Sequence, residues 1–558
     1  MAELHSAASK DARVEGLMTI SQWRAALASR RPAVRDALAA IYGEGREAVD
    51  QREAKLAEMI EAFAAAFGDA RAVVAARAPG RVNLMGRHID HRGGFINTIA
   101  IPNDVWIVAA ARDDGRLSLR NLDPAFEPHD LDPTALWQAA ATADWRDFVD
   151  SDATRAFLAG RRGSWANYGL GAWLRLRRAF GDRLAGGFDA LYWGDVPRSV
   201  GLSSSSSVFV ATAIAVARLG GMEVDPDCLA TLCGEGEWFV GTRGGAGDHA
   251  AMLYGRRGKV SQIGFFPMRL ERQASLPDDL EIILCNSGER AQKSREARDR
   301  FNGRVAAYEI ALAVLRDRQP GLTARVEHLR DLSPGRLGVG AERIYGALKS
   351  VPVWMTRDEI AAALHGRLEP IEHWFSTHGD LDGGYPLRAV LLYGIAECER
   401  SRCALETMSG GDPARIRRLF AISHDGDRVT ARASGGQRRP WTAACDNGFL
   451  DDLIRRLRDD DSARCESAEL AWQPGAYGCS TPGIDEMVDI ANAVDGVLGA
   501  QLVGAGLGGS IVVLARTGTA ARLAAALERG YYTARGIAPE VHVFQPAAGA
   551  SCFAPAFG

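Results

Sequence analysis

A run of five serines leading into an apolar segment is the feature that most constrains this chain. Residues 194–208 read GDVPRSVGLSSSSSV and continue directly into FVATAIAVAR at 209–218. Apolar residues also precede the run, so we predict a strand, a tight loop and a buried helix in succession. The free backbone N–H groups at the start of such a helix, together with serine hydroxyls, form a ready site for a phosphate group.

Two other interpretations of this segment have to be considered. Glycine- and serine-rich runs are also typical of flexible linkers, but the alanine-, valine- and isoleucine-rich residues that follow favour a buried helix. No Gly-Lys-Ser/Thr sequence is present here, so the loop is not a Walker A loop. The segment therefore predicts a nucleotide site of another kind.

The composition excludes several classes of protein. The 558 residues are 47% hydrophobic and 24% charged with a formal net charge of −4, as expected of a globular protein with two to four domains. No long basic run suggests a nucleic-acid partner. The longest apolar runs, near 208–219 and 501–515, are interrupted or too short to span a bilayer, so we expect no membrane partner. Nine scattered cysteines and the absence of a signal-like N-terminus predict a cytoplasmic protein with reduced thiols.

A polar tip follows an N-terminal segment with helical periodicity. Residues 73–94 predict two strands that meet in a turn at Pro79-Gly80, and further strands are expected at 95–101 and 105–111. The tip runs from 87 to 94 and gathers Arg87, His88, Asp90, His91 and Arg92. The arginines argue against a metal ion, whereas this set of donors and acceptors suits a polyhydroxylated ligand. A solvated loop is the alternative.

Two glycine-rich stretches lie further along the chain. Asp248 follows a glycine-rich turn at the start of a short helix, where an aspartate is commonly a helix N-cap; the neighbouring glycines also permit a ligand to approach closely. Residues 504–509 (GAGLGG) fit G-x-G-x-x-G in letters, but an apolar strand follows where a dinucleotide-binding helix would be needed. We therefore predict a tight glycine hairpin between two strands.

Three of these segments together carry a family resemblance. The sequences APGRVNLMGRHID at 78–90, GLSSSSS at 201–207 and GAGLGG at 504–509 resemble, in that order, the three signature motifs of the GHMP kinases, and specifically of their galactokinase branch. Residues 247–249, 419–424 and 545–550 extend the similarity, which covers about 70–310 and 385–555.

The resemblance implies an α+β fold of two lobes with the active site between them. One lobe would be of the ribosomal-S5-like type and the other an α/β lobe, with ATP bound over the serine loop. We expect a helical N-terminal extension at 1–70, an N-terminal lobe at 71–270 and a C-terminal lobe at 271–558, with an insertion around 319–387. The chain would act as a monomer or homodimer.

The resemblance also assigns roles to individual residues. Asp248 matches the catalytic aspartate that takes the proton from a sugar's anomeric hydroxyl, and Arg81 matches the arginine that steadies it. Residues that match sugar-binding positions are Arg87, His88, Asp90 and Gly247. Residues that match the ATP phosphate loop are Gly201, Leu202, Ser203, Ser204, Ser205, Ser206 and Ser207. The glycine loop of the second lobe corresponds to Gly504, Gly506, Gly508 and Gly509.

A magnesium ion is expected to accompany ATP. Ser205 matches the position whose hydroxyl joins the ion, and oxygen ligands suit this cation. The family supplies a glutamate from the helix before Asp248. Glu235 and Glu237 both lie near that position, and we favour Glu237.

One departure from the family bears on the sugar. Galactokinases have Gly-Glu-His-Thr-Asp-Tyr where this chain has Gly-Arg-His-Ile-Asp-His at 86–91. An arginine is suited to bind a carboxylate, and the pattern is also similar to that of galacturonokinases. We therefore expect an ATP-dependent kinase that phosphorylates the C1 hydroxyl of a galactose-like monosaccharide, with an acidic or C6-modified sugar as the first hypothesis. The alternatives are galactose itself and a sensor that binds ATP and sugar without catalysis.

Overall fold

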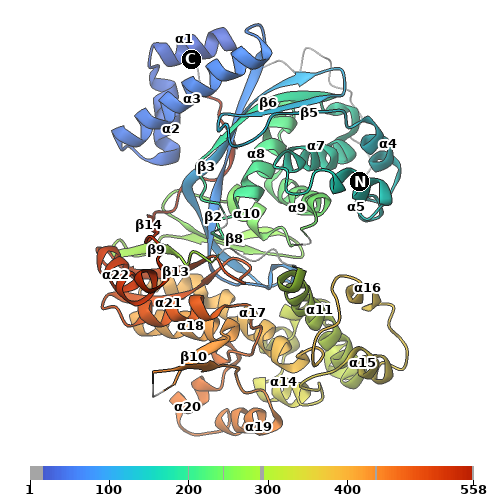
Figure 1. Ribbon diagram of the computed structural model, residues 1–558. Helices are drawn as coiled ribbons and strands as arrows, with labels where there is room; N and C mark the ends of the chain where they lie inside the picture. The colour runs from blue at the N-terminus through green and yellow to red at the C-terminus, as the bar shows by residue number, and fades with distance from the viewer. Residues whose placement is uncertain (1–16, 199, 243, 290–294, 434–435, 556–558) are drawn as a thin grey trace.

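A nine-stranded sheet forms the centre of the N-terminal lobe (Figure 1). The computed structural model describes residues 17–555 except 199, 243, 290–294 and 434–435. The main strands follow the order β1-β2-β3-β6-β4-β5, while β7 extends from β3, β8 from β7 and β15 from β2. Their bounds are β1 Met18–Thr19, β2 Ala72–Met85, β3 Ile96–Arg112, β4 Leu117–Asn121, β5 His129–Leu131, β6 Gly187–Gly194, β7 Val260–Gly264, β8 Arg269–Ala274 and β15 Ser551–Cys552.

Helices cover both faces of this sheet, and the strand sequences show why. Alternate residues of a strand point to opposite faces, and β2 and β3 carry apolar residues on both faces. Val74 and Ile107 belong to a core with α7 (Ala166–Phe180) and α8 (Ser204–Leu219). Val73 and Trp106, one position away in each strand, pack in a separate core with the N-terminal helices α1 (Ile20–Ala28), α2 (Pro32–Tyr42) and α3 (Arg46–Phe67). The N-terminal helices therefore complete the lobe as its second outer layer.

Two of the predicted strand breaks are absent. The turn expected at Pro79-Gly80 was wrong: β2 continues through it, and a register shift between Pro79 and Arg81 takes up the irregularity. A Cβ atom at Gly80 would lie 3.0 Å from the Leu202 carbonyl oxygen, so a glycine is needed where the strand meets the serine loop. The two strands expected between 95 and 111 are one strand, β3.

A polar network joins α3 to the base of the serine loop. The Arg52 guanidinium donates to the Asp195 carboxylate at 2.6 Å and to the Pro102 carbonyl oxygen at 3.2 Å. It also lies over the rings of Tyr42 and Trp193. Because Asp195 directly follows β6, this network connects the helical extension with the strand that leads to the serine loop.

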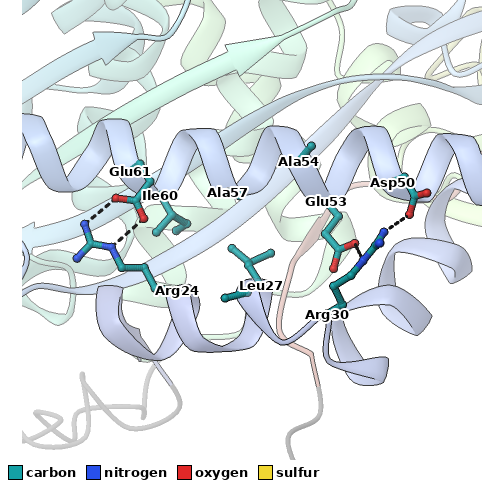
Figure 2. Close-up of a pocket in the computed structure, with 10 residues that line it drawn as sticks. Arg24, Leu27, Arg30, Asp50, Glu53, Ala54, Ala57, Ile60 and Glu61 are labelled. Carbon is teal, nitrogen blue, oxygen red and sulfur yellow. Dashed lines mark hydrogen bonds and ion pairs between the residues drawn. The ribbon is translucent and has the colours of Figure 1, made fainter.

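The N-terminal helices also contain a groove of about 500 Å³ between α1 and α3 (Figure 2). Leu27, Ala57 and Ile60 line its apolar part. Ion pairs of Arg24 with Glu61 and of Arg30 with Asp50 lie along its sides. No residue of the predicted site lines it.

The C-terminal lobe is built on a smaller antiparallel sheet. Its four strands have the order β12-β13-β9-β14, with bounds β9 Leu280–Asn286, β12 Val497–Val503, β13 Ser510–Arg516 and β14 Val541–Phe544. One face packs on α21 (Pro482–Asn492) and α22 (Ala520–Leu527). The helix α18 (Pro413–Asp427) contacts β12.

Two long helices carry the rest of this lobe. The helices α11 (Arg295–Arg318) and α17 (Leu387–Gly410) pack against each other and share one core with the segment expected as an insertion. That segment holds α12 (Pro320–Thr323), α13 (Pro334–Leu337), α14 (Ala341–Leu348), α15 (Arg357–Ala363) and α16 (Glu372–Phe375). The same core includes α19 (Asn447–Arg456), while α20 (Ser462–Ser467) and the hairpin β10–β11 (Thr430–Arg432 and Arg438–Pro440) lie beside it.

Within the described ranges, no helix combines the length and apolar character that crossing a bilayer requires. The nine cysteines are all free thiols.

Candidate functional site

The serine-rich segment forms the loop between β6 and α8, as its sequence predicts. Gly201 and Ser203 have positive φ values of +84° and +56°, so the chain turns sharply before α8 begins at Ser204. No side chain caps the first turn of this helix, which leaves its N–H groups available to an anion. Ser206 and Ser207 are buried, and the Ser207 hydroxyl donates to the Pro79 carbonyl oxygen at 2.9 Å. Of the five serine side chains, the first three are therefore partly exposed and the other two are buried. The binding of ATP phosphate by this loop stays a prediction.

Asp248 and Arg81 meet beside this loop. Asp248 lies in the first turn of α10 (Gly247–Leu253), whose N-cap position is Ala246, so it is not the helix cap. The Arg81 Nε and Nη2 atoms each donate to one oxygen of the Asp248 carboxylate at 2.7 Å, and Nη1 donates to the Gly201 carbonyl oxygen at 2.6 Å. The Ser203 hydroxyl donates to the same carboxylate. One arginine thus holds both the aspartate and the serine loop.

The electrostatics of Asp248 keep it ionised. Burial raises the pKa of its carboxyl group, but the charge and hydrogen bonds of Arg81 and the Ser203 hydroxyl outweigh this effect, so the pKa lies below its ordinary value. The side chain is 37% exposed. A charged carboxylate is therefore accessible to a ligand next to the serine loop.

The structure brings Asp90 of the polar tip to the same place. A Cβ atom added to Gly247, the residue before Asp248, would lie 2.9 Å from the Asp90 Oδ2 atom. His91 Nδ1 lies 3.0 Å from Asp90 Oδ1. Burial raises the pKa of Asp90, yet hydrogen bonds from His91 and from the Gly247 backbone outweigh it and lower the pKa to about 2. Two ionised carboxylates thus flank the Gly247 backbone.

Arg87 does not extend into this site, which corrects the expectation that it meets a substrate carboxylate. Its side chain is buried between the lobes, where Nε donates to Asp427 at 3.1 Å and Nη1 donates to Gln501 at 2.5 Å. Its third partner is Ser423, through both the carbonyl oxygen and the hydroxyl. The guanidinium is therefore fully engaged within the protein.

His88 lies close to the same partners. Its Nε2 atom is 3.4 Å from Asp427 Oδ1, and its ring stacks on Tyr477 with a centroid distance of 4.2 Å. Burial raises the pKa of Asp427, but His88 and Arg87 outweigh it and hold the pKa well below its usual range. The role of His88 as a sugar ligand stays a prediction.

The two candidate metal-binding glutamates point in different directions. Glu235 accepts hydrogen bonds from Arg175 at 3.0 and 2.5 Å, so its carboxylate is already paired. Glu237 is buried, and its Oε1 atom makes no hydrogen bond in the described part of the chain; His249 Nε2 lies 3.4 Å from it. Tyr168 senses both candidate ligands: burial and the Glu237 charge raise the pKa of Tyr168, while a hydrogen bond with Ser205 lowers it. Glu237 is therefore the better candidate.

The glycine hairpin between β12 and β13 abuts the serine loop. The Ser510 hydroxyl donates to the Val200 carbonyl oxygen at 2.8 Å. A Cβ atom at Gly504 would lie 3.4 Å from the Gly201 Cα atom, and one at Gly506 would lie 2.2 Å from the Cys479 carbonyl oxygen. A side chain at Gly506 would therefore clash with the Cys479 segment, whereas a Cβ atom at Gly504 would make an ordinary van der Waals contact with the serine loop. Positive φ values also occur at Gly508 and Gly509.

The sequence did not reveal the partners of the tip in the C-terminal lobe. Ser423 and Asp427 lie at the end of α18, Gln501 in β12, and Tyr477 in a loop. Ser423 lies in the 419–424 segment of the family resemblance, and the other three belong to none of the motifs described above. Only the folded structure brings them to Arg87 and His88.

Comparisons with known proteins agree with this arrangement. The galactokinase galactose-binding signature matches residues 61–111, the GHMP kinases N terminal domain matches 167–256 and the GHMP kinases C terminal matches 449–533. The galactokinase of Roseiflexus sp. is 26% identical over 84% of this chain and 90% of the relative, and that of Chloroflexus aggregans is 26% identical over 89% and 98%.

A solved structure has the same fold. Lactococcus lactis galactokinase complexed with galactose superimposes with a TM-score of 0.60 and 20% identity, over 88% of this chain and 98% of that one. The α+β fold with two lobes is confirmed by this likeness. Together with the three matching family models and the galactokinase relatives, it supports the resemblance of this chain to the GHMP kinases, and specifically to their galactokinase branch.

Proposed function

We propose that this chain is an ATP-dependent kinase that phosphorylates the anomeric C1 hydroxyl of galactose or a closely similar neutral monosaccharide. The observation that carries the proposal is the position of the Asp248 carboxylate. It is held by Arg81 beside the uncapped N-terminus of α8 and separated from Asp90 by the Gly247 backbone. A proton acceptor, a phosphate-binding helix end and a hydroxyl-binding carboxylate thus converge on one place.

The residues support a direct transfer of the γ-phosphoryl group. Asp248 accepts the proton of the C1 hydroxyl as its oxygen attacks phosphorus, and the bond from phosphorus to the β-γ bridging oxygen breaks. The products are the sugar 1-phosphate and ADP. Arg81 and the N–H groups of α8 stabilise the negative charge of the transferring group, and catalysis of this kind depends mainly on positioning and charge stabilisation.

The donor set fits a magnesium ion bound with ATP. The Ser205 hydroxyl and the Glu237 carboxylate are hard oxygen donors, and Glu237 Oε1 is buried without a hydrogen-bond partner among the described residues. No group of three or more His, Cys, Asp or Glu side chains forms a metal site in that part of the chain. This agrees with an ion that takes most of its ligands from phosphates and water. When bound, the ion would neutralise charge on the phosphates.

A neutral sugar fits the site better than an acidic one. The hypothesis of an acidic sugar rested on Arg87 and on the similarity of the surrounding pattern to galacturonokinases. The guanidinium of Arg87 is committed to Asp427, Gln501 and Ser423. The nearest side chain of the tip to Asp248 is instead the ionised Asp90, which would repel a carboxylate and accept hydrogen bonds from sugar hydroxyls.

The test is ADP release from purified protein with ATP and a panel of sugars, including galactose, galacturonate, galactosamine and heptoses. We expect ADP release that requires the presence of galactose or a closely related sugar. Strong turnover of galacturonate alone would contradict the neutral-sugar proposal. Absence of turnover with every sugar, together with measurable binding of ATP and galactose, would identify a non-catalytic sensor instead.

A further inference from the structure

The residues that begin the sugar-binding tip are fastened to the opposite lobe. Gly86, Arg87 and His88 follow β2 directly, and each contacts the C-terminal lobe. The Gly86 N–H donates to Glu397 of α17 at 2.9 Å. Arg87 binds Asp427, and His88 lies 3.4 Å from the same aspartate.

The contacts of Arg87 are unusually complete for one side chain. Its guanidinium uses all three nitrogens, on Asp427, Gln501 and Ser423, and the side chains of Arg87 and Asp427 are 1% and 0% exposed. Gln501 in turn donates through Nε2 to the Leu84 carbonyl oxygen in β2. We refer to Arg87, Asp427, Ser423, Gln501 and Glu397 as the tip anchor.

Arg400, which lies beside the tip anchor, balances its charges. The Ser423 hydroxyl donates to Glu397 at 3.1 Å, and Glu397 is paired with Arg400 at 2.8 Å. Two arginines therefore face two carboxylates in a region without solvent. Galactokinases have a glutamate at position 87, which here would place a third carboxylate beside Asp427 and Glu397. The arginine at 87 and the aspartate at 427 thus require each other.

We propose that Arg87, through its ion pair with Asp427, is a positioning residue that holds the tip residues 88–94 in their sugar-binding conformation. The inference rests on the proposed sugar kinase function. In this proposal Arg87 affects sugar binding without contacting the sugar. The sugar has no direct contact with residue 87, but it binds to tip residues 88–94 that are already ordered.

The expected kinetic signature follows from this ordering. If the tip is released and ordered in only a fraction of molecules, the apparent sugar dissociation constant rises by the inverse of that fraction. Saturating sugar restores the ordered state, so kcat is retained. A tip ordered in one tenth of molecules therefore raises the sugar KM about tenfold with little change in kcat or in the KM for ATP.

The test compares three double variants designed to keep buried charge paired or absent. Arg87→Met/Asp427→Leu removes the ion pair. Arg77→Met/Asp104→Leu is the matched control, because that pair is also fully buried, at 2.5 Å, but joins β2 and β3 away from the tip. Arg87→Lys/Asp427→Glu keeps both charges but replaces the planar guanidinium fork with an ammonium that cannot serve all three partners. Circular dichroism and a cooperative melt establish that each variant is folded.

Two measurements are made on each folded variant. We expect Arg87→Met/Asp427→Leu to raise the sugar KM about tenfold or more, with kcat and the ATP KM within about threefold of wild type. Amide hydrogen exchange of a peptide covering 86–94 should accelerate at least about tenfold in it. The Arg77→Met/Asp104→Leu control should change neither the sugar KM nor the exchange rate. For Arg87→Lys/Asp427→Glu, both quantities should lie between those of wild type and of Arg87→Met/Asp427→Leu. Unchanged sugar KM and unchanged exchange in the folded first variant would overturn the proposal, as would a loss confined to kcat.

The two proposals fail in distinguishable ways. If wild-type protein phosphorylates no sugar, the proposed function fails, and exchange of the 86–94 peptide alone decides whether Arg87 orders the tip. If wild type is active but the Arg87→Met/Asp427→Leu variant retains wild-type sugar KM and protection, the positioning role fails and the kinase assignment stands.

Discussion

Arg81 and Asp248 are 167 positions apart in the sequence, yet two guanidinium nitrogens of Arg81 each lie 2.7 Å from one oxygen of the Asp248 carboxylate. A paired geometry of this kind fixes the orientation of the carboxylate as well as its charge. The same arginine binds the Gly201 carbonyl oxygen, so the proposed acceptor of the proton and the proposed phosphate-binding loop are held to a common point.

Replacement of Asp248 tests its proposed role as the base. We expect Asp248→Asn to lower kcat by about 10²–10⁴-fold while ATP binding persists, because the amide keeps the shape but cannot accept the proton. Steady-state ADP release and equilibrium titration with an ATP analogue measure the two effects. Asp227→Asn, which alters a carboxylate at the start of α9 (Pro226–Gly236), serves as the control. A kcat within threefold of wild type would exclude Asp248 as the base.

The contrast between Glu237 and Glu235 makes a second prediction. Glu237→Gln should raise the magnesium concentration needed for half-maximal activity about tenfold or more, because it removes a charged oxygen ligand. Glu235→Gln, whose carboxylate is paired with Arg175, should leave that concentration unchanged. Activity titrated with magnesium at fixed ATP measures both. The reverse ranking would assign the ion to Glu235.

The docking of the N-terminal helices is tested at Arg52. This side chain is only 13% exposed and links α3 to the partly exposed Asp195 and, at 3.3 Å, to the buried Asp104. Because Asp104 keeps Arg77 as a partner, Arg52→Met should lower the free energy of unfolding by roughly 1–3 kcal/mol. Lys55→Met, on the same helix and paired with the exposed Glu58, should cost about 0.5 kcal/mol or less. Urea denaturation compares the two variants. Equal midpoints for Arg52→Met and Lys55→Met would show that the Arg52 network does not add to the stability of the fold.

The lowered pKa of Asp90 predicts a dependence of stability on pH. A carboxyl group whose folded pKa is about 2 and whose unfolded pKa is about 3.9 stabilises the fold at all pH values above about 4. That contribution is lost as the pH falls from about 4 towards 2. Asp90→Asn should therefore lower the Tm at pH 7, and the difference from wild type should shrink in acid.

Melts between pH 7 and 3 measure this difference. Asp152, whose side chain is 99% exposed, provides the control: Asp152→Asn should show no comparable trend. A constant Tm difference for Asp90→Asn across the range would mean that ionisation of Asp90 does not support the fold.

The sequence predicted those parts of the site in which local chemistry decides the structure. The five serines before an apolar helix and the glycines between two apolar strands have few alternative conformations, and both loops formed as expected. Helical periodicity at 23–42 and 54–67 likewise predicted helices where the structure has α1, α2 and α3, but it did not predict the break before Pro32 that divides the first stretch into α1 and α2. The position of Asp248 beside Arg81 followed from the family resemblance.

Arg87 shows why the remainder could not be predicted. Its charge suggested a ligand, but its partners Asp427 and Gln501 lie 340 and 414 positions away, and nothing in the local pattern around 87 distinguishes a side chain that faces the site from one that faces the other lobe. The unbroken β2 is a similar case. A proline and a glycine commonly form a turn, and only the approach of Leu202 to Gly80 explains why the strand continues.

The pairing of β15 with β2 has a consequence for biosynthesis. Ser551 and Cys552 lie opposite Arg77 and Ala76 in the antiparallel pair, and the Phe553 N–H donates to the Ala75 carbonyl oxygen at 2.8 Å. The Phe553 ring packs between Trp23 and Trp106. During translation, the strand that contains Arg81 therefore lacks its β15 partner until residues encoded nearly five hundred codons later have been made. Until those residues leave the ribosome, the nascent first lobe has an open strand edge and an uncovered aromatic pair, both of which invite association with other chains. We expect this protein to depend on cellular chaperones while it is being made, and to be sensitive to small deletions at its last strand.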